Sequence, residues 1–193
     1  MRAFSPLLAL FAATVSGMAV VAPDVQYQVV LNTNNRFPDC PQSSAEPTKL
    51  VRLFNADTET FMYSTAPGFG TEAEARDGYE FDAVAASVFL TPQPSTVPFY
   101  HLLNKETSTS FYTRHERERD AVLAEDPEGL LWVDHGVAAY VFPRRMCGAK
   151  PFYRAHNMHS GSWFFSTSEQ ELDQMVANEG YTTPAIAGFV LLA

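Results

Sequence analysis

Three asparagines occupy the same place in three related stretches of the chain. Asn55, Asn104 and Asn157 end the apolar runs LVRLFN, PFYHLLN and PFYRAHN, and polar or small residues follow each of them. An asparagine side chain bonds the backbone two residues further on and tolerates left-handed backbone geometry, so a turn-forming role accounts for the pattern. The alternative is that each turn presents its amide to a ligand.

Aromatic side chains accompany these turns. Trp163 follows the third asparagine, and Trp132 lies shortly before the apolar run GVAAYVFP. Carbohydrate sites combine aromatic rings, which lie under the apolar faces of sugars, with amides that bond the sugar hydroxyls. The candidate ligand is therefore a glycan or a cell-wall polysaccharide. The candidate ligand-binding residues are Asn55, Asn104, Asn157, Trp163 and Trp132.

The sequence contains none of the common catalytic or metal-binding signatures. It has no G-x-S-x-G, no H-E-x-x-H and no phosphate-binding glycine loop. His156 and His159 form an H-x-x-H pair, but no carboxylate or cysteine accompanies them, so exposed turn histidines are expected. The carboxylates at 116–120 and 169–173 have helical spacing and predict a solvated helix surface. We expect no catalytic residue, no metal and no cofactor.

The asparagine turns belong to a longer repeat. A second short run, MYST, FYTR or FFST, follows each turn and places Tyr63, Tyr112 and Phe165 in one register. A charged segment comes next, and each copy ends on a small-residue run, AVAASVFL, GVAAYVFP or AIAGFVLL. Each unit therefore predicts a strand, a turn, a strand, a helix and a strand. Gly78 predicts that the helix of the first copy is short or distorted.

Three such units, at about residues 48–95, 96–148 and 149–193, make up the predicted domain. None could bury its apolar face alone, and closing the units on one another would protect their sheet edges. The predicted fold class is α+β, with three strand-strand-helix-strand repeats closed into a compact pseudo-threefold domain. A short open array is the alternative. The small-residue runs are predicted to be the innermost strands, buried on both faces.

The N-terminal segment has the features of a secretory signal peptide. Residues 1–19 hold one basic residue, an apolar run too short to span a bilayer, and small residues suited to cleavage. Residues 20–47 predict an N-terminal strand, VQYQVVLN, and a linker rich in proline and serine. The mature protein is therefore expected to be secreted and extracellular, with no membrane segment after cleavage.

The cysteine count predicts a disulfide, and the net charge bears on nucleic-acid binding. Cys40 and Cys147 are the only cysteines, and an even pair in a secreted chain most often forms a disulfide. Two buried free thiols are the alternative. The formal net charge of −9 at pH 7 argues against nucleic-acid binding, because an acidic surface repels the phosphate backbone.

The second copy carries a family resemblance. It holds four motifs, F-Y-x-x-x-N at 99–104, F-Y-T at 111–113, E-x-E-R-D at 116–120 and W-V-x-x-G-V-A-A-Y at 132–140. Over about residues 48–193 the chain resembles the secreted repeat family of domain of unknown function 5648. The resemblance implies an extracellular repeat module and no known activity. That family commonly has a histidine just before F-Y-T, where this chain has Phe61, Ser110 and Trp163, so no role of that imidazole carries over.

These features favour a secreted, non-catalytic binding module directed at carbohydrate or the cell wall. One alternative is a small secreted hydrolase with a site formed between repeats, since a nucleophile and its base can come from distant segments. Another is a secreted effector that binds a protein partner through an exposed apolar patch. No oligomeric state is predicted.

Overall fold

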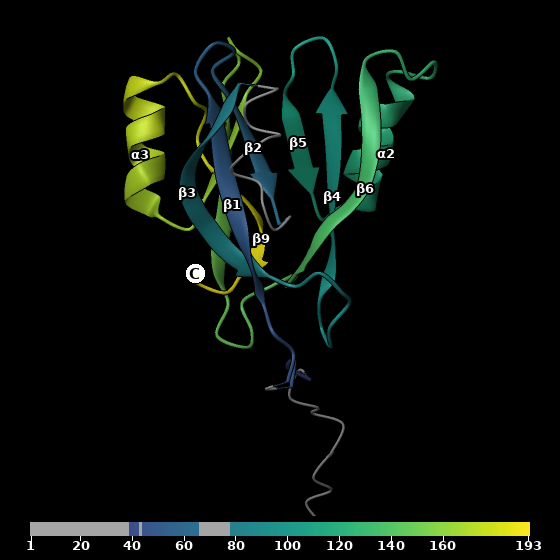
Figure 1. Ribbon diagram of the computed structural model, residues 1–193, viewed down its shortest axis with the longest axis vertical. Coiled ribbons are helices and arrows are strands. Elements are labelled where there is room, and N and C mark those ends of the chain that lie inside the picture. Colours follow the sequence, from purple (N-terminus) through teal and green to yellow (C-terminus); the bar gives the residue numbers. More distant parts are fainter. Residues whose placement is uncertain (1–38, 43, 66–77) are drawn as a thin grey trace, which may run out of the picture. The chain divides into compact units, whose positions relative to one another are not determined.

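Three antiparallel sheets of three strands each follow one another along the chain (Figure 1). The computed structural model describes residues 39–42, 44–65 and 78–193, all within the unit Arg36–Ala193. The predicted signal peptide, the predicted strand VQYQVVLN and the predicted helix before Gly78 lie outside these described residues. Within the described part, no helix has the length and apolar character needed to cross a membrane.

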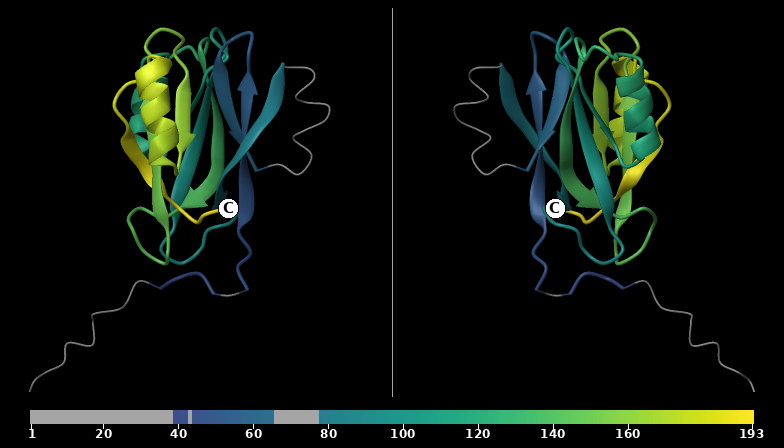
Figure 2. Two further views of the ribbon diagram at one scale, coloured as in Figure 1. Left: turned by 90° about the vertical axis from the view of Figure 1, so that its left-hand side faces the viewer. Right: turned by 90° about the vertical axis from the view of Figure 1, so that its right-hand side faces the viewer.

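Each sheet is built by one repeat. The first repeat forms β1 (Thr48–Asn55), β2 (Thr60–Ser64) and β3 (Tyr79–Val88). The second forms β4 (Val97–Asn104), β5 (Ser110–Thr113), α2 (Glu116–Ala124) and β6 (Trp132–Val141). The third forms β7 (Lys150–His156), β8 (Trp163–Ser166), α3 (Glu169–Asn178) and β9 (Ala185–Val190). The first strand of each sheet is central, and α2 and α3 lie outside the sheets (Figures 1 and 2). The predicted α+β class is confirmed, as is the predicted order of elements in the second and third repeats.

The three asparagines form the turns between the first and second strands. The Oδ1 atom of each accepts hydrogen bonds from the backbone N–H groups two and three residues further on, at 2.8 to 3.2 Å. The fourth residue after each asparagine has a left-handed φ, 54° at Glu59, 56° at Ser108 and 72° at Gly161. Only the third copy uses glycine there, the residue that adopts this conformation without steric cost. The turn-forming role predicted for the asparagines is confirmed.

The ends of the three final strands pair with one another. Backbone hydrogen bonds in both directions join Phe89 to Tyr140, Phe142 to Phe189 and Leu191 to Ser87. The first residues of these pairs are equivalent in the repeat, and so are the second residues. The bridges therefore link the repeats in the cyclic order first to second, second to third and third to first. They support pseudo-threefold closure, which stays a prediction.

The small-residue strands lie beside the central first strand of each sheet, and their buried residues belong to the hydrophobic core, as Ala86, Ala139 and Ala187 do. One face of each is buried, with Ala86, Ala139 and Val141 at most 1% exposed. The other face is open, since Val137 and Ile186 are 42% and 45% exposed. The prediction of burial on both faces is therefore wrong for β6 and β9, whose second face carries these exposed side chains.

Side chains of the second strands meet in the core. The rings of Tyr63, Tyr112 and Phe165 pack edge to face in all three pairs, with centroids 5.2 to 5.7 Å apart. The Tyr112 hydroxyl donates to the Tyr63 carbonyl and accepts from the Tyr63 N–H, and the Tyr63 hydroxyl bonds the Phe165 backbone in the same way. Burial raises the pKa of both phenols, which therefore stay protonated. Phe165 has no hydroxyl with which to continue this series.

Two arginines of first strands reach the helix of another repeat. Arg52 binds Glu171 of α3 through two guanidinium nitrogens at 2.6 and 3.2 Å, and it also pairs with Asp82. Arg154 binds Glu118 of α2 at 2.6 and 3.1 Å. Burial opposes ionisation of both glutamates, but hydrogen bonds from arginine and from a nearby hydroxyl, together with the arginine charge, outweigh it and hold the pKa of each below its usual value. The expectation of a solvated helix surface is wrong at these two half-buried positions.

Cys40 and Cys147 form the predicted disulfide, with Cα atoms 5.5 Å apart. The bond ties the segment before β1 to the connection between β6 and β7, across 107 residues of chain. Disulfides are typical of proteins that fold in an oxidising compartment. Secretion itself stays a prediction.

Candidate ligand-binding grooves between repeats

Two grooves lie at junctions between repeats. Groove A, of about 410 Å³, lies between the second and third repeats, and groove B, of about 330 Å³, lies between the third and first. Each is lined by the asparagine turn and the helix of one repeat and by the first and second strands of the next. The two grooves therefore occupy equivalent places in the repeat pattern.

The predicted ligand-binding residues are distributed unequally between the grooves. Asn104, Trp132 and Trp163 line groove A together, and Asn157 lines groove B. Asn55 lines neither groove. It is only 5% exposed, and its side chain lies so close to the Gly78 backbone that an added Cβ there would be 2.9 Å from Nδ2. The structure thus brings three of the five residues together and places Asn55 in a structural role.

Trp163 forms a packed wall of groove A. Its ring stacks on His156, with centroids 4.2 Å apart and planes 18° from parallel, and tilts against Phe111 at 5.1 Å. The Arg154 guanidinium lies 5.2 Å from the indole centroid. Burial lowers the pKa of His156, and Arg154 adds to this effect, so the imidazole is neutral at neutral pH. Neighbouring groups therefore cover much of the Trp163 ring.

Trp132 supplies the second indole of groove A. It is half-buried, and within the described part of the chain its ring stacks on no other aromatic ring. Asp126 positions it, because the carboxylate accepts the backbone N–H groups of Leu130, Leu131 and Trp132 at 3.1, 2.8 and 2.7 Å. These bonds, the one from Trp132 foremost, hold the pKa of Asp126 below its usual value. The backbone around Trp132 is thus fixed while its ring remains open to a ligand.

Asn104 brings an unused hydrogen-bond donor to groove A. Its Oδ1 accepts the N–H groups of Glu106 and Thr107, both at 3.0 Å, which fixes the orientation of the amide. Among the described residues, Nδ2 of Asn104 has no hydrogen-bond partner. The equivalent Nδ2 of Asn157 donates to the carbonyl of Glu179 at 2.7 Å. Only the first of these two amides is therefore ready to donate to a ligand.

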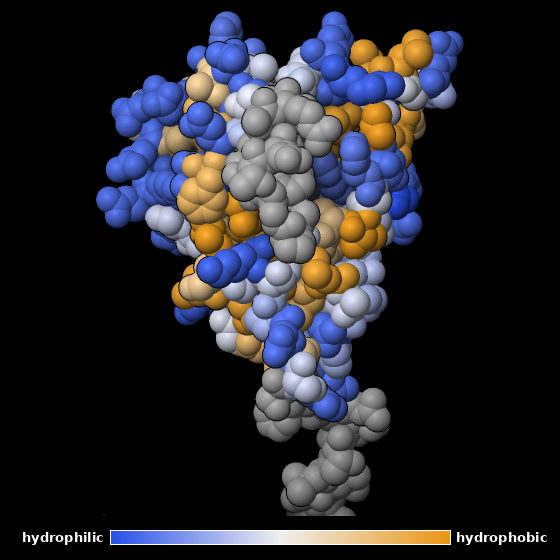
Figure 3. All heavy atoms as spheres, viewed as in Figure 1, coloured by the Kyte–Doolittle hydropathy of each residue, from blue (hydrophilic) through white to orange (hydrophobic). Residues whose placement is uncertain are grey.

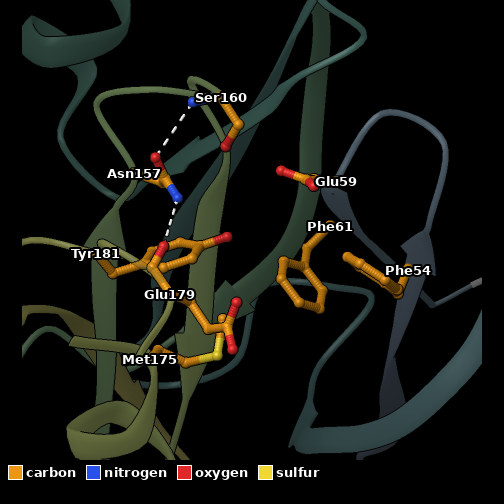
Figure 4. A pocket seen from close by; sticks show the side chains of 8 residues that line it. All are labelled: Phe54, Glu59, Phe61, Asn157, Ser160, Met175, Glu179 and Tyr181. Atoms are coloured by element: carbon orange, nitrogen blue, oxygen red, sulfur yellow. Dashed lines mark hydrogen bonds between the residues drawn. The ribbon is translucent and has the colours of Figure 1, made fainter. Parts of the chain in front are cut away.

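Groove B has a more acidic lining. The first repeat contributes Phe54, Glu59 and Phe61, and the third contributes Asn157, Ser160, Met175, Glu179 and Tyr181 (Figure 4). The two phenylalanine rings are 4.7 Å apart. Burial raises the pKa of the Tyr181 phenol, and the nearby carboxylates of Glu179 and Glu59 raise it further. Groove B therefore combines aromatic rings with two carboxylates.

A family model connects this architecture to known sequences. The model for Domain of unknown function (DUF5648) matches residues 43–191. The chain belongs to this family. Neither a curated protein nor a solved structure matches it. The match spans all three sheets of the DUF5648 domain and every residue that lines the two grooves.

The DUF5648 domain departs from its own repeat at the junction between the first and second copies. His101 occupies the position that holds the helix-binding arginine in the other two copies. When Asp77 is aligned with Asp120 and Asp173, Ala75 occupies the position of the arginine-binding glutamates. The His101 ring stacks on Tyr112 at 4.4 Å, and Nε2 bonds Ser110 Oγ at 3.1 Å. Burial, together with repulsion from a neighbouring histidine, lowers the pKa of His101 to about 4. A neutral stacked ring replaces the charged pair here.

Sequence reasoning missed the residues that position the grooves. Arg52 and Arg154 each stand three residues before an asparagine, and Glu118 and Glu171 each stand fourteen after one. This recurrence could have predicted arginine–glutamate pairs, although not which repeats they join. No such recurrence marks Asp126. Its carboxylate binds the backbone N–H groups of Leu130, Leu131 and Trp132, and these contacts depend on the conformation of the loop.

Proposed function

We propose that this DUF5648 domain is a secreted, non-catalytic module that binds carbohydrate of a cell wall or a glycoprotein in the grooves between its repeats. The observation that carries the proposal lies in groove A, where an unstacked indole, Trp132, accompanies a free amide donor, Nδ2 of Asn104. A sugar ring offers an apolar C–H face to an aromatic ring and hydroxyl oxygens to amide donors.

Both groups are held before a ligand arrives. Asp126 fixes the backbone of Trp132, and two turn N–H groups fix the amide of Asn104. The hydroxyls of Thr107 and Thr109, which also line groove A, bond each other at 2.8 Å. Binding to such a preformed surface orders few side chains, which lowers the entropic cost of association.

Groove A supports binding better than it supports hydrolysis. Arg154 and the Thr113 hydroxyl both donate hydrogen bonds to the Glu118 carboxylate. These bonds favour the ionised carboxylate, whereas a general acid in hydrolysis must be protonated. The His156 ring is stacked on Trp163 and has a lowered pKa. These two titratable groups of the groove are engaged in packing and in joining repeats.

The apolar surface favours a carbohydrate ligand over a protein partner. The most exposed large apolar side chains include Phe81, Leu130 and Met158, one from each repeat, and also Leu90 and Leu192, which follow the paired ends of β3 and β9. On the face seen in Figure 3, hydrophobic residues are interspersed with hydrophilic ones. On that face, apolar side chains interspersed with hydrophilic ones are ordinary for a protein surface, whereas a partner site for protein is usually a contiguous patch.

A glycan and polysaccharide binding screen of the mature domain tests this proposal. Trp132→Ala should weaken binding of a captured glycan roughly tenfold, the loss expected for one stacking ring. Leu130→Ala is the matched control, because it removes an apolar side chain that is 65% exposed in the same loop and does not line groove A. A folded, disulfide-bonded protein that binds no glycan would contradict the proposal, and an unaffected Trp132→Ala variant would remove groove A from it.

A further inference from the structure

We infer that groove B binds a protonated amino sugar, so that the domain distinguishes a cationic polysaccharide from its neutral acetylated form. The inference rests on the proposed function and assigns a ligand class to the second groove. It comes from the lining of groove B, which holds two carboxylates beside three aromatic rings.

The carboxylates of groove B are available to a cation. Glu59 and Glu179 are exposed, and within the described residues neither makes an ion pair. The nearby cation is Arg52, whose guanidinium lies 5.7 Å from the Phe61 centroid, but it is buried and already paired with Asp82 and Glu171. Groove B therefore presents negative charge that the surrounding side chains do not neutralise.

The rest of the lining fits an organic cation better than a metal ion. Phe54, Phe61, Tyr181 and the thioether of Met175 give groove B an apolar wall (Figure 4). A metal ion such as Ca²⁺ needs six or more oxygen ligands at fixed distance, and the described residues contain no group of three or more potential metal ligands of the His, Cys, Asp and Glu types. An ammonium group on an apolar ring instead gains from carboxylates and from the faces of aromatic rings together.

An amino sugar matches each part of this lining. Its C–H face can lie on Phe54 or Phe61, its ammonium group can face Glu59 and Glu179, and the Ser160 and Tyr181 hydroxyls can bond its hydroxyl groups. In Figure 4, Glu59 stands with the phenylalanines on the first-repeat side, while Glu179 stands with Tyr181 on the third-repeat side. The charge is thus supplied from both walls.

Groove A provides an internal comparison. At the position of Glu59 it has Gly161, and its own carboxylate, Glu118, is bound by Arg154. Equivalent grooves of one fold thus differ in charge, and the cationic ligand belongs to groove B alone. The net charge of −9 also favours the approach of a polycation and predicts that its binding weakens as salt is added.

The test compares hexamers of glucosamine and of N-acetylglucosamine by calorimetry, at a mildly acidic pH where the free amines are protonated. The wild-type protein should bind the glucosamine hexamer more tightly. Glu59→Gln combined with Glu179→Gln should weaken that binding roughly tenfold, as expected from losing two solvent-exposed charge contacts, and should remove the preference and most of its salt dependence. Leu130→Ala, which changes a side chain that lines neither groove, should leave the preference unchanged. Both glutamates are exposed, so the glutamine variants are expected to fold, which urea unfolding verifies.

The outcomes separate this inference from the proposed function. If glycans bind but the two hexamers bind equally, or if the double glutamine variant keeps the preference, the inference about groove B is wrong and the binding module stands. If the screen and both hexamers show no binding, the proposed function fails and the inference fails with it. A lysine-rich peptide that competes as well as the glucosamine hexamer would also overturn the assignment to a sugar.

Discussion

The buried histidine at the junction of the first two repeats predicts a specific loss of stability at mildly acidic pH. In the folded protein the pKa of His101 is about 4, against an ordinary value of 6.5. Between these two pH values the imidazole is protonated in the unfolded chain but neutral in the folded protein. The free energy of unfolding therefore falls as the pH falls. Linkage gives a loss of roughly 2 kcal/mol between about pH 7.5 and about pH 5 from this residue. Glu118 and Glu171 contribute little to this window, because their lowered pKa values place most of their loss below the ordinary value of 4.5.

Urea unfolding of the wild type and of His101→Gln at the two pH values measures this loss. Glutamine does not titrate and can still bond the Ser110 hydroxyl, so the variant should be less stable at neutral pH but should lose about 2 kcal/mol less on acidification. His156 also has a lowered pKa, but it is present in both proteins and cancels in the difference. Equal losses in the two proteins would show that His101 takes up its proton in the folded state without cost, and the argument from burial would be refuted.

Three further predictions follow from the contacts between repeats. Phe165→Tyr should place a hydroxyl at the Tyr112 backbone, where it can repeat the bonds that Tyr63 and Tyr112 make. The free energy of unfolding should rise by about 1 kcal/mol. A loss of stability would argue against cyclic equivalence of the repeats. A double-mutant cycle of Arg154→Ala and Glu118→Ala should give a coupling energy of about 1 to 2 kcal/mol. If the two changes in unfolding free energy were additive, the ion pair would not hold the repeats together. Reducing the disulfide should lower stability by roughly 4 to 5 kcal/mol, since it closes a loop of 107 residues, and an unchanged urea midpoint would contradict this.

The local structure of the repeats was predictable because short-range patterns determine it. The asparagine turns, the order of strands and helices and the disulfide partners all follow from residues that lie close together or from the only available pairing. The place of each strand within its sheet was not predictable in the same way. Apolar runs such as GVAAYVFP have the composition of a buried strand, yet β6 lies beside the central strand of its sheet and Val137 is exposed.

The candidate site was predicted only in part, because it lies between repeats. Asn104, Trp132 and Trp163 meet in groove A, but the sequence holds no information on which face of one copy meets which face of the next. Trp163 also has a larger packing role than expected, since His156 and neighbouring side chains cover its ring. Contacts across a junction depend on how whole units dock, and periodicity within one unit does not report them.

The repeat positions divide into two groups with different behaviour. The position of Tyr63, Tyr112 and Phe165 faces the core and is aromatic in all three copies. The position two residues before each of them is Phe61, Ser110 or Trp163, and it lies in groove B in the first copy and in groove A in the third. The first position is aromatic in every copy, whereas the second, although buried at Phe61 and Ser110, holds three different side chains. Groove B presents two carboxylates without an ion-pair partner among the described residues, whereas the carboxylate of groove A, Glu118, is paired with Arg154, and this is the contrast that the proposed difference in ligand between the grooves requires.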